Sequence, residues 1–209
     1  MESLLLHSCC APCSAAVIEW MLNNDIQPTV YYYNPNIFPR EEYEKRKAEL
    51  TRYCGERGIT VIDGDWEHDV WRKAARGLEL EPERGRRCQA CFNLRLAAAA
   101  KKCHELGLKR FTTTLASSRW KDLKQVDAAG FAAAALYEDV TYWDKNWRKG
   151  GLQERRNELI RLHHFYNQLW CGCEFSMAGL KEREVRAAQT TARSNDNTPT
   201  ISSDKSDGS

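Results

Sequence analysis

The feature that most limits the fold of this chain is an alternation of short β-prone runs with longer helical segments. The runs SLLLHS at 3–8, TVYYY at 29–33 and RFTTTL at 110–115 are short and apolar or rich in β-branched and aromatic residues. Longer helical patterns separate them, among them a charged one at 40–57 and an alanine-rich one at 91–106. Alternation at this spacing predicts an α/β fold, with a mostly parallel sheet flanked by helices.

Weaker patterns complete the expected order of elements. Two further strands are expected, at 59–62 and 140–143. Four further helical segments are expected, at 14–22, near Trp71, at 121–136 and at 153–165. The last helix gives the fold a C-terminal helical part. After about residue 187 the chain has no aromatic residue and is rich in Ser, Thr, Asp and Asn. We therefore expect one domain over 1–186 and a disordered tail over 187–209.

Charge and hydropathy argue against two classes of protein. Lys and Arg number 31 and Asp and Glu 29, so a net charge of +2 does not fit a general polyanion binder, although a local basic face is compatible with it. The sequence has no apolar run of about 18 residues, so no membrane-spanning helix is expected. The beginning, MESLLLHSCCAPCS, has no basic region ahead of its short leucine run. A secretory signal is therefore not expected, and a cytoplasmic location is predicted.

Nine cysteines are the main chemical feature of the sequence. Most of them fall into three tight clusters, which are Cys9, Cys10 and Cys13, then Cys88 and Cys91, then Cys171 and Cys173. An odd total fits poorly with a secreted disulfide scaffold, and cytosolic thiols are kept reduced. Clustered thiols in that setting are typical of metal binding or redox chemistry. The two isolated cysteines, Cys54 and Cys103, are expected to be small buried apolar residues.

The first two clusters together can supply four thiolates to one site. The CCAPC loop follows the first strand, and ligands of parallel sheets collect at the carboxyl ends of strands. The spacing of Cys88 and Cys91 lets two thiolates hold one metal or cluster, and a helix start at Cys91 favours thiolate. Four thiolates suit either zinc or an iron–sulfur cluster, and spacing alone leaves both open. The adjacent pair Cys9 and Cys10 favours an iron–sulfur cluster over a single zinc ion, because neighbouring side chains diverge and a cluster with several iron atoms tolerates that divergence better. Cys13 is either a further ligand or a buried apolar residue.

The third cluster, Cys171-Gly172-Cys173, allows a tight disulfide because glycine supplies backbone freedom. Strained disulfides have high reduction potentials and are often catalytic. The alternatives are two further metal ligands or two inert thiols.

Charged residues near the predicted loop ends form two further candidate sites. Basic residues stand beside aromatic or cysteine residues around Arg87, Arg119 and Lys121, a mixture that fits single-stranded nucleic acid. An ordinary solvated surface is the alternative for each run. Acidic residues at 63–67, among them Asp65, suit a metal ligand or a proton donor, and a solvated loop is the alternative.

Five segments resemble one family in the same order along the chain. They are HSCCAPCS at 7–14, YYYNPNIFP at 31–39, EPERGRRCQACFNLRL at 81–96, TTTLASS at 112–118 and CGCEFS at 171–176. Together they are similar to the cobalamin-independent epoxyqueuosine reductases, the QueH family. The resemblance implies a fold similar to the adenine nucleotide alpha hydrolase-like (HUP) class. It also implies an oxidoreductase that removes the epoxide oxygen of epoxyqueuosine at the tRNA wobble position to give queuosine, the last step of queuosine biosynthesis.

The resemblance also assigns roles to the cysteines. It places a 4Fe–4S cluster on Cys9, Cys10, Cys88 and Cys91, and a redox-active disulfide on Cys171 and Cys173. A further iron is implied beside the cluster, with Cys13 and Asp65 as its candidate ligands. The expected partners are tRNA bearing epoxyqueuosine, contacted by Arg87, Arg119 and Lys121, and an electron donor that the sequence does not identify.

Two other functions compete with this one. The first is a zinc-stabilised nucleic-acid-binding module without catalysis. The second is a nucleotide-dependent sulfur-transfer enzyme or ligase of the same fold class. The second alternative would need a glycine-rich loop after the first strand, and CCAPCS contains no glycine.

Overall fold

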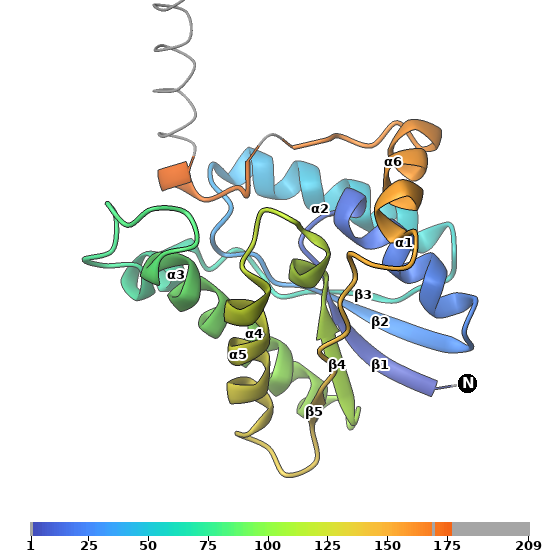
Figure 1. The fold of residues 1–209 in the computed structure, drawn as a ribbon, viewed down its shortest axis with the longest axis horizontal. Coiled ribbons are helices and arrows are strands. Elements are labelled where there is room, and N and C mark those ends of the chain that lie inside the picture. The colour runs from blue at the N-terminus through green and yellow to red at the C-terminus, as the bar shows by residue number, and fades with distance from the viewer. Residues whose placement is uncertain (1, 169, 177–209) are drawn as a thin grey trace, which may run out of the picture.

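A computed structural model of the chain describes residues 2–168 and 170–176 (Figure 1). Its centre is a five-stranded sheet in the order β3-β2-β1-β4-β5, and every neighbouring pair is parallel. The strands are β1 (Glu2–His7), β2 (Ile26–Tyr32), β3 (Val61–Asp63), β4 (Arg110–Thr113) and β5 (Thr141–Tyr142). The predicted α/β class with a parallel sheet is confirmed, and the likeness to the alpha hydrolase class is compatible with this topology.

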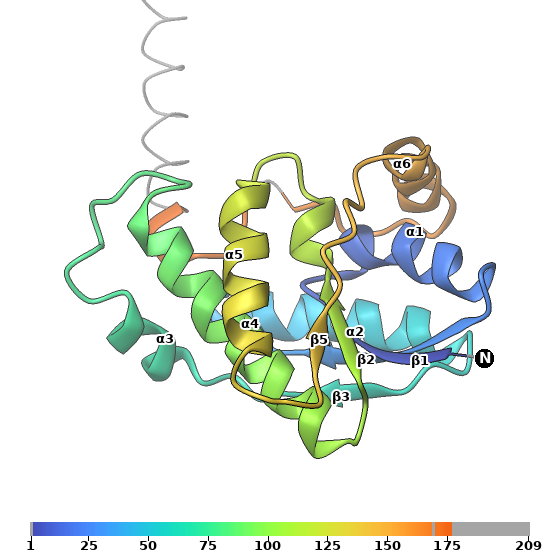
Figure 2. The ribbon, with the colours of Figure 1, turned by 60° about the horizontal axis from the view of Figure 1, so that its bottom comes forward.

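Helices cover both faces of the sheet. They are α1 (Ala11–Leu22), α2 (Arg40–Gly55), α3 (His68–Ala74), α4 (Arg86–Glu105), α5 (Leu123–Ala134) and α6 (Leu152–Leu162). Helix α1 packs against α2 and α6 on one face, while α4 packs against α5 on the other, as Figure 2 shows. Among the described residues, none of these helices has both the length and the apolar character needed to cross a membrane.

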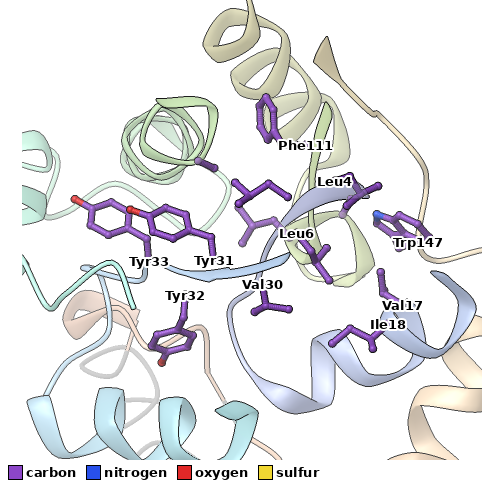
Figure 3. Close-up of a cluster of buried hydrophobic side chains, with 14 of the residues drawn as sticks. Leu4, Leu6, Val17, Ile18, Val30, Tyr31, Tyr32, Tyr33, Phe111 and Trp147 are labelled. Carbon is purple, nitrogen blue, oxygen red and sulfur yellow. The ribbon is translucent and has the colours of Figure 1, made fainter. Parts of the chain in front are cut away.

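The core lies on both sides of the two central strands. Leu4, Leu5 and Leu6 of β1 are fully buried, as expected for a parallel strand covered on both faces. Tyr31 of β2 and Tyr33, which follows the strand, point toward α4, while Tyr32 points toward α2 (Figure 3). Because burial of each large apolar side chain contributes about 2 kcal/mol, these strands anchor the sheet.

The bounds of several elements differ from the sequence expectation, and two of these differences lie at the carboxyl edge of the sheet. Helix α4 begins at Arg86 and not at Cys91, with Gly85 as its N-cap residue. Strand β4 ends at Thr113 and continues as the 3-10 helix η1 (Thr114–Ser117), because the Thr113 hydroxyl accepts a hydrogen bond from the N–H of Leu115. The predicted end of the domain at 186 and the tail at 187–209 lie outside the described residues.

Candidate functional site

The register of the sheet brings the ends of three strands together. His7, the last residue of β1, is paired with Tyr31 of β2 and Thr113 of β4. Its Nε2 donates to the Tyr33 carbonyl at 3.1 Å, so its Nδ1 accepts from the Thr113 hydroxyl at 2.7 Å. Burial lowers the pKa of His7 to about 3, and the neutral ring ties the three strand ends to one another. The loops that follow these ends therefore lie side by side.

Three thiols gather in the first of these loops. The sulfur atoms of Cys9, Cys10 and Cys13 all lie within 4.8 Å of one another. Cys10 is the N-cap residue of α1 in extended conformation, and Pro12 stands in the first turn, where it needs no backbone partner. The sharp change from strand to helix turns consecutive side chains toward one point. These three residues could hold a metal ion.

The three thiols are not equivalent. Hydrogen bonds from Cys10 and then Cys13 hold the pKa of Cys9 well below its ordinary value, and the charges of Lys121 and Arg95 lower it further. The Thr114 hydroxyl also donates to the Cys9 sulfur at 3.5 Å. Cys9 is therefore the member of the group that most favours the thiolate form, and the Cys10 sulfur also lies 3.3 Å from the Gln168 Oε1.

The second cysteine pair lies at the start of α4. Cys88 and Cys91 stand three residues apart in the first two turns, so they share one face of the helix. The N–H of Arg84 donates to the Cys88 sulfur at 3.3 Å, although burial raises the pKa of this thiol. Helix α4 lies between the parallel strands β3 and β4 in the chain, just as α1 lies between β1 and β2. The N-termini of α4 and α1 therefore lie at the same edge of the sheet, where the strands end.

The CGC segment joins the second pair. After α6 the chain crosses back toward α3 and α4 (Figure 1), and Cys173 packs in one buried cluster with Cys91 and Trp71. Cys173 forms an isolated antiparallel bridge with Ile37, and the Phe38 N–H donates to the Gly172 carbonyl at 2.9 Å. The segment is thus held by the loop that follows β2.

Arg46 of α2 provides a second anchor for this segment. It is buried with Glu42 as its ion-pair partner, and its guanidinium donates to the Cys171 carbonyl at 3.3 Å. Asn36 donates to the same carbonyl at 3.4 Å. Two independent donors therefore fix the position of Cys171.

The two thiols of this segment differ in proton affinity. A hydrogen bond from Cys173 is the main reason that the pKa of Cys171 lies well below its ordinary value, with Lys121 adding to the effect. The pKa of Cys173 is raised because its proton is shared with Cys171 and its sulfur is buried. The pair is a thiolate beside a thiol, which is the arrangement that thiol–disulfide exchange needs.

Two cations balance these thiolates. Lys121 follows η1, and the charges of Cys171 and then Cys9 raise the pKa of its ammonium, against the opposing effect of burial. Arg95 is buried one turn beyond Cys91 and donates to the Asn34 side chain, while its Nε has no partner among the residues that the structure describes. Within residues 2–168 and 170–176, neither cation forms an ion pair with a carboxylate. A buried charge of this kind needs a nearby anion, and the thiolates supply it.

The other predicted site residues have different surroundings. Asp65 is exposed and lies outside the group formed by the three thiols. Arg87 is buried, and its Nη1 donates to the carbonyls of Glu79 at 2.7 Å and Glu81 at 2.6 Å, so it supports the loop before α4. Arg119 is exposed and stacks on Trp120. Cys54 and Cys103 are buried in the core, as predicted.

Several residues around the thiols were missed by the sequence analysis, namely Asn34, Arg46, Arg95, Thr114 and Gln168. Asn34 and Thr114 could have been found from the sequence, because the NPN turn and the TTT run that contain them follow or end predicted strands at the carboxyl edge of the sheet. Arg46 carried none, because it lies within a charged helical pattern that is typical of a solvated face. Arg95 lies at the end of the family-like segment 81–96, but nothing in the pattern marked it as a buried charge.

Gly172 should be the least replaceable glycine of this site. Its φ is +96°, and an added Cβ would lie 2.8 Å from Ile37 Cγ1 and 3.1 Å from Arg46 Nη1. We expect Gly172→Ala to lower the free energy of unfolding by about 3 kcal/mol, from backbone strain and overpacking together. Urea unfolding of the whole chain measures it. Gly77→Ala is the control, since Gly77 also has positive φ but nothing lies within 4 Å, and its expected loss is about 1 kcal/mol. Equal losses in the two variants would contradict the close approach.

Comparison with known proteins gives one consistent result. The sequence profile of the family described as "Epoxyqueuosine reductase QueH" matches residues 4–179. A protein of that name from Histophilus somni is 48% identical over 189 residues, covering 90% of this chain and 78% of the relative. The relative from Haemophilus influenzae is 48% identical, covering 84% and 72%. The relative from Acinetobacter baylyi is 45% identical, covering 84% and 81%.

Proposed function

Because the chain belongs to the epoxyqueuosine reductase QueH family, we propose that it reduces the epoxide of epoxyqueuosine in tRNA to the cyclopentene of queuosine. The observation that carries the proposal is the convergence of thiols from three distant segments at one edge of the sheet. A tRNA-modifying enzyme works where tRNA is found, so a cytoplasmic location is part of the proposal.

For the cofactor, we propose a 4Fe–4S cluster held by Cys9, Cys10, Cys88 and Cys91. Thiolates are the usual ligands of such clusters, and a four-thiolate centre carries net negative charge. The cations Arg95 and Lys121, which lack carboxylate partners in the described part of the chain, fit a centre of that charge. When bound, the cluster supplies single-electron transfer and a Lewis-acidic iron. For an additional iron, Cys13 is the best-placed ligand because it lies with Cys9 and Cys10. A role for Asp65 in that site stays a prediction.

The proposed electron source is the Cys171 and Cys173 pair. Opening the epoxide to an alkene takes two electrons and two protons and releases the oxygen as water. Oxidation of the Cys171 thiolate and the Cys173 thiol to one disulfide supplies two electrons and one proton, and the reaction balances when solvent supplies the second proton. An external electron donor then returns the disulfide to two thiols. The lowered pKa of Cys171 suits it to react as a thiolate. The raised pKa of Cys173 keeps the proton of the pair on this sulfur until the disulfide forms.

The same balance leaves one proton to be supplied from outside the cysteine pair. His7 uses both ring nitrogens within the protein and has a pKa of about 3. Burial raises the pKa of Tyr33, whose hydroxyl donates to Glu67 at 2.8 Å. Neither side chain is suited to deliver a proton, so solvent is the proposed source of the second proton.

For the RNA, we propose that Arg119 and Lys121 contact the tRNA backbone. Arg119 is exposed, and Lys121 lies beside the thiols, so both face the region where the substrate nucleotide must enter. Contact between Arg87 and a phosphate stays a prediction, because its Nη1 is used by backbone carbonyls.

Arg95 should set the electronic properties of the bound cluster. We expect Arg95→Met to move the midpoint potential of the cluster to more negative values, because a buried cation stabilises the more negative reduced state. Arg95→Lys should recover part of the shift. A redox titration followed by absorbance measures it, and the control is Arg52→Met, at the C-terminal end of α2 with an exposed partner, Glu56. An unchanged potential in Arg95→Met would show that the guanidinium does not sense the cluster.

The proposal is tested by anaerobic purification, metal analysis and an assay on tRNA bearing epoxyqueuosine. An iron–sulfur protein is brown, absorbs broadly near ~400 nm and is bleached by dithionite. We expect iron, sulfide and formation of queuosine. Colourless protein that contains zinc, binds RNA and leaves the epoxide intact would instead establish the zinc-stabilised nucleic-acid-binding module.

A further inference from the structure

We propose that Trp120 is a stacking platform for a base of single-stranded RNA next to the substrate nucleotide. The inference rests on the proposed function and adds to it the residue that positions the anticodon loop. Trp120 is 68% exposed at the carboxyl edge of the sheet, whereas Trp71 and Trp147 are almost completely buried. An indole this exposed contributes little to the core, and much of its ring is open to a stacking partner.

The backbone that carries Trp120 is held rigidly. Arg84 donates from Nε to the Trp120 carbonyl at 2.9 Å and from Nη2 to the Arg119 carbonyl at 3.4 Å. On the other side, Arg148 donates to the Lys121 carbonyl at 2.9 Å. A platform that is already fixed loses little conformational entropy when a base stacks on it.

The same contacts place Trp120 beside the thiol site. Arg84 contacts the Trp120 carbonyl through its side chain and the Cys88 sulfur through its own N–H at 3.3 Å. Lys121, the next residue along the chain, lies in the field of Cys9 and Cys171. Trp120 therefore stands at the border between the thiols and solvent.

The charges around the indole indicate which partner it fits. The Arg119 guanidinium lies over the Trp120 ring, 5.1 Å from its centroid, and Arg84 adds a second cation to the same loop pair. An aromatic face flanked by arginines is the arrangement that binds single-stranded RNA, since the ring stacks on a base while the cations meet phosphates. An apolar surface of a protein partner would fit these two guanidinium groups poorly.

The test uses the loaded, full-length protein and an anticodon stem-loop RNA. We expect Trp120→Ala to raise the Kd for the RNA and the KM for epoxyqueuosine-containing tRNA by about tenfold. The kcat and the cluster absorbance should change by less than about twofold, since uniform binding alone is lost. Trp120→Phe should restore most of the affinity, because a smaller ring still stacks. Leu136→Ala is the matched control, 66% exposed just beyond the C-terminal end of α5, and it should bind RNA like the unmodified protein.

Two results would overturn the inference. The first is an RNA affinity in Trp120→Ala equal to that of the unmodified protein. The second is a defect seen only with a protein electron donor and absent with dithionite, which would identify the indole as a protein-docking residue. The RNA-binding measurement needs no turnover, so it decides the role of Trp120 even if the unmodified protein fails to reduce epoxyqueuosine.

Discussion

Replacing Cys88 with alanine is expected to abolish cluster loading and epoxide reduction together. Cys88 stands in the first turn of α4, where the helix dipole and the Arg84 N–H stabilise a thiolate. Alanine removes one of the four proposed sulfur ligands and offers no other donor. Iron and sulfide per chain, the absorbance near ~400 nm and the rate on tRNA substrate measure the loss.

The control for this variant lies on the same helix. Cys103 is fully buried, and its thiol donates to the Leu108 carbonyl at 3.2 Å, far along α4 from the sheet edge where Cys88 lies. Cys103→Ala should keep its iron and its activity and lose only about 1 kcal/mol of stability, from one buried hydrogen bond. A brown and active Cys88→Ala protein would show that the cluster is held by other residues.

Replacing Cys171 with serine is expected to leave the cluster intact and to reduce multiple-turnover activity to background. Cys171 is the thiolate of the CGC pair and is held by Arg46 and Asn36 through its backbone carbonyl, so serine preserves the segment's position. Without its sulfur no disulfide can form, and the two electrons of the proposed reaction have no source. Steady-state rates and the absorbance of the cluster separate the two effects.

A thiol count gives the second measurement for Cys171→Ser. The unmodified protein should lose two alkylatable thiols when mixed with substrate in the absence of a donor, and the variant should lose none. Ser176→Ala is the control, since the Ser176 hydroxyl makes only one hydrogen bond with the Cys171 sulfur, at 3.4 Å, and the variant should leave both the thiol loss and turnover in place. Normal steady-state kinetics in Cys171→Ser would end the redox assignment of this pair.

The order of elements could be predicted because strand and helix patterns are local. The leucine run of β1 and the tyrosine run of β2 have the composition of buried strands, and the alternation with helices implies parallel pairing. The start of α4 was wrong by five residues, since Arg86 and Arg87 resemble a polar loop when only the pattern is considered. Helix ends depend on capping and on nearby loops, which a periodicity does not contain.

By itself, the sequence determined the fold class, the three cysteine clusters and the resemblance to one family, because each depends on residues that are close in the chain or on a fixed order of motifs. Only the tertiary structure decided which groups surround the thiols. It tied Arg87 to the carbonyls of the preceding loop, buried Arg95 against Asn34, and brought Cys173 against Cys91. The physical reason is that burial and electrostatic pairing depend on contacts between segments far apart in sequence, and these contacts exist only once the sheet has fixed the ends of its strands.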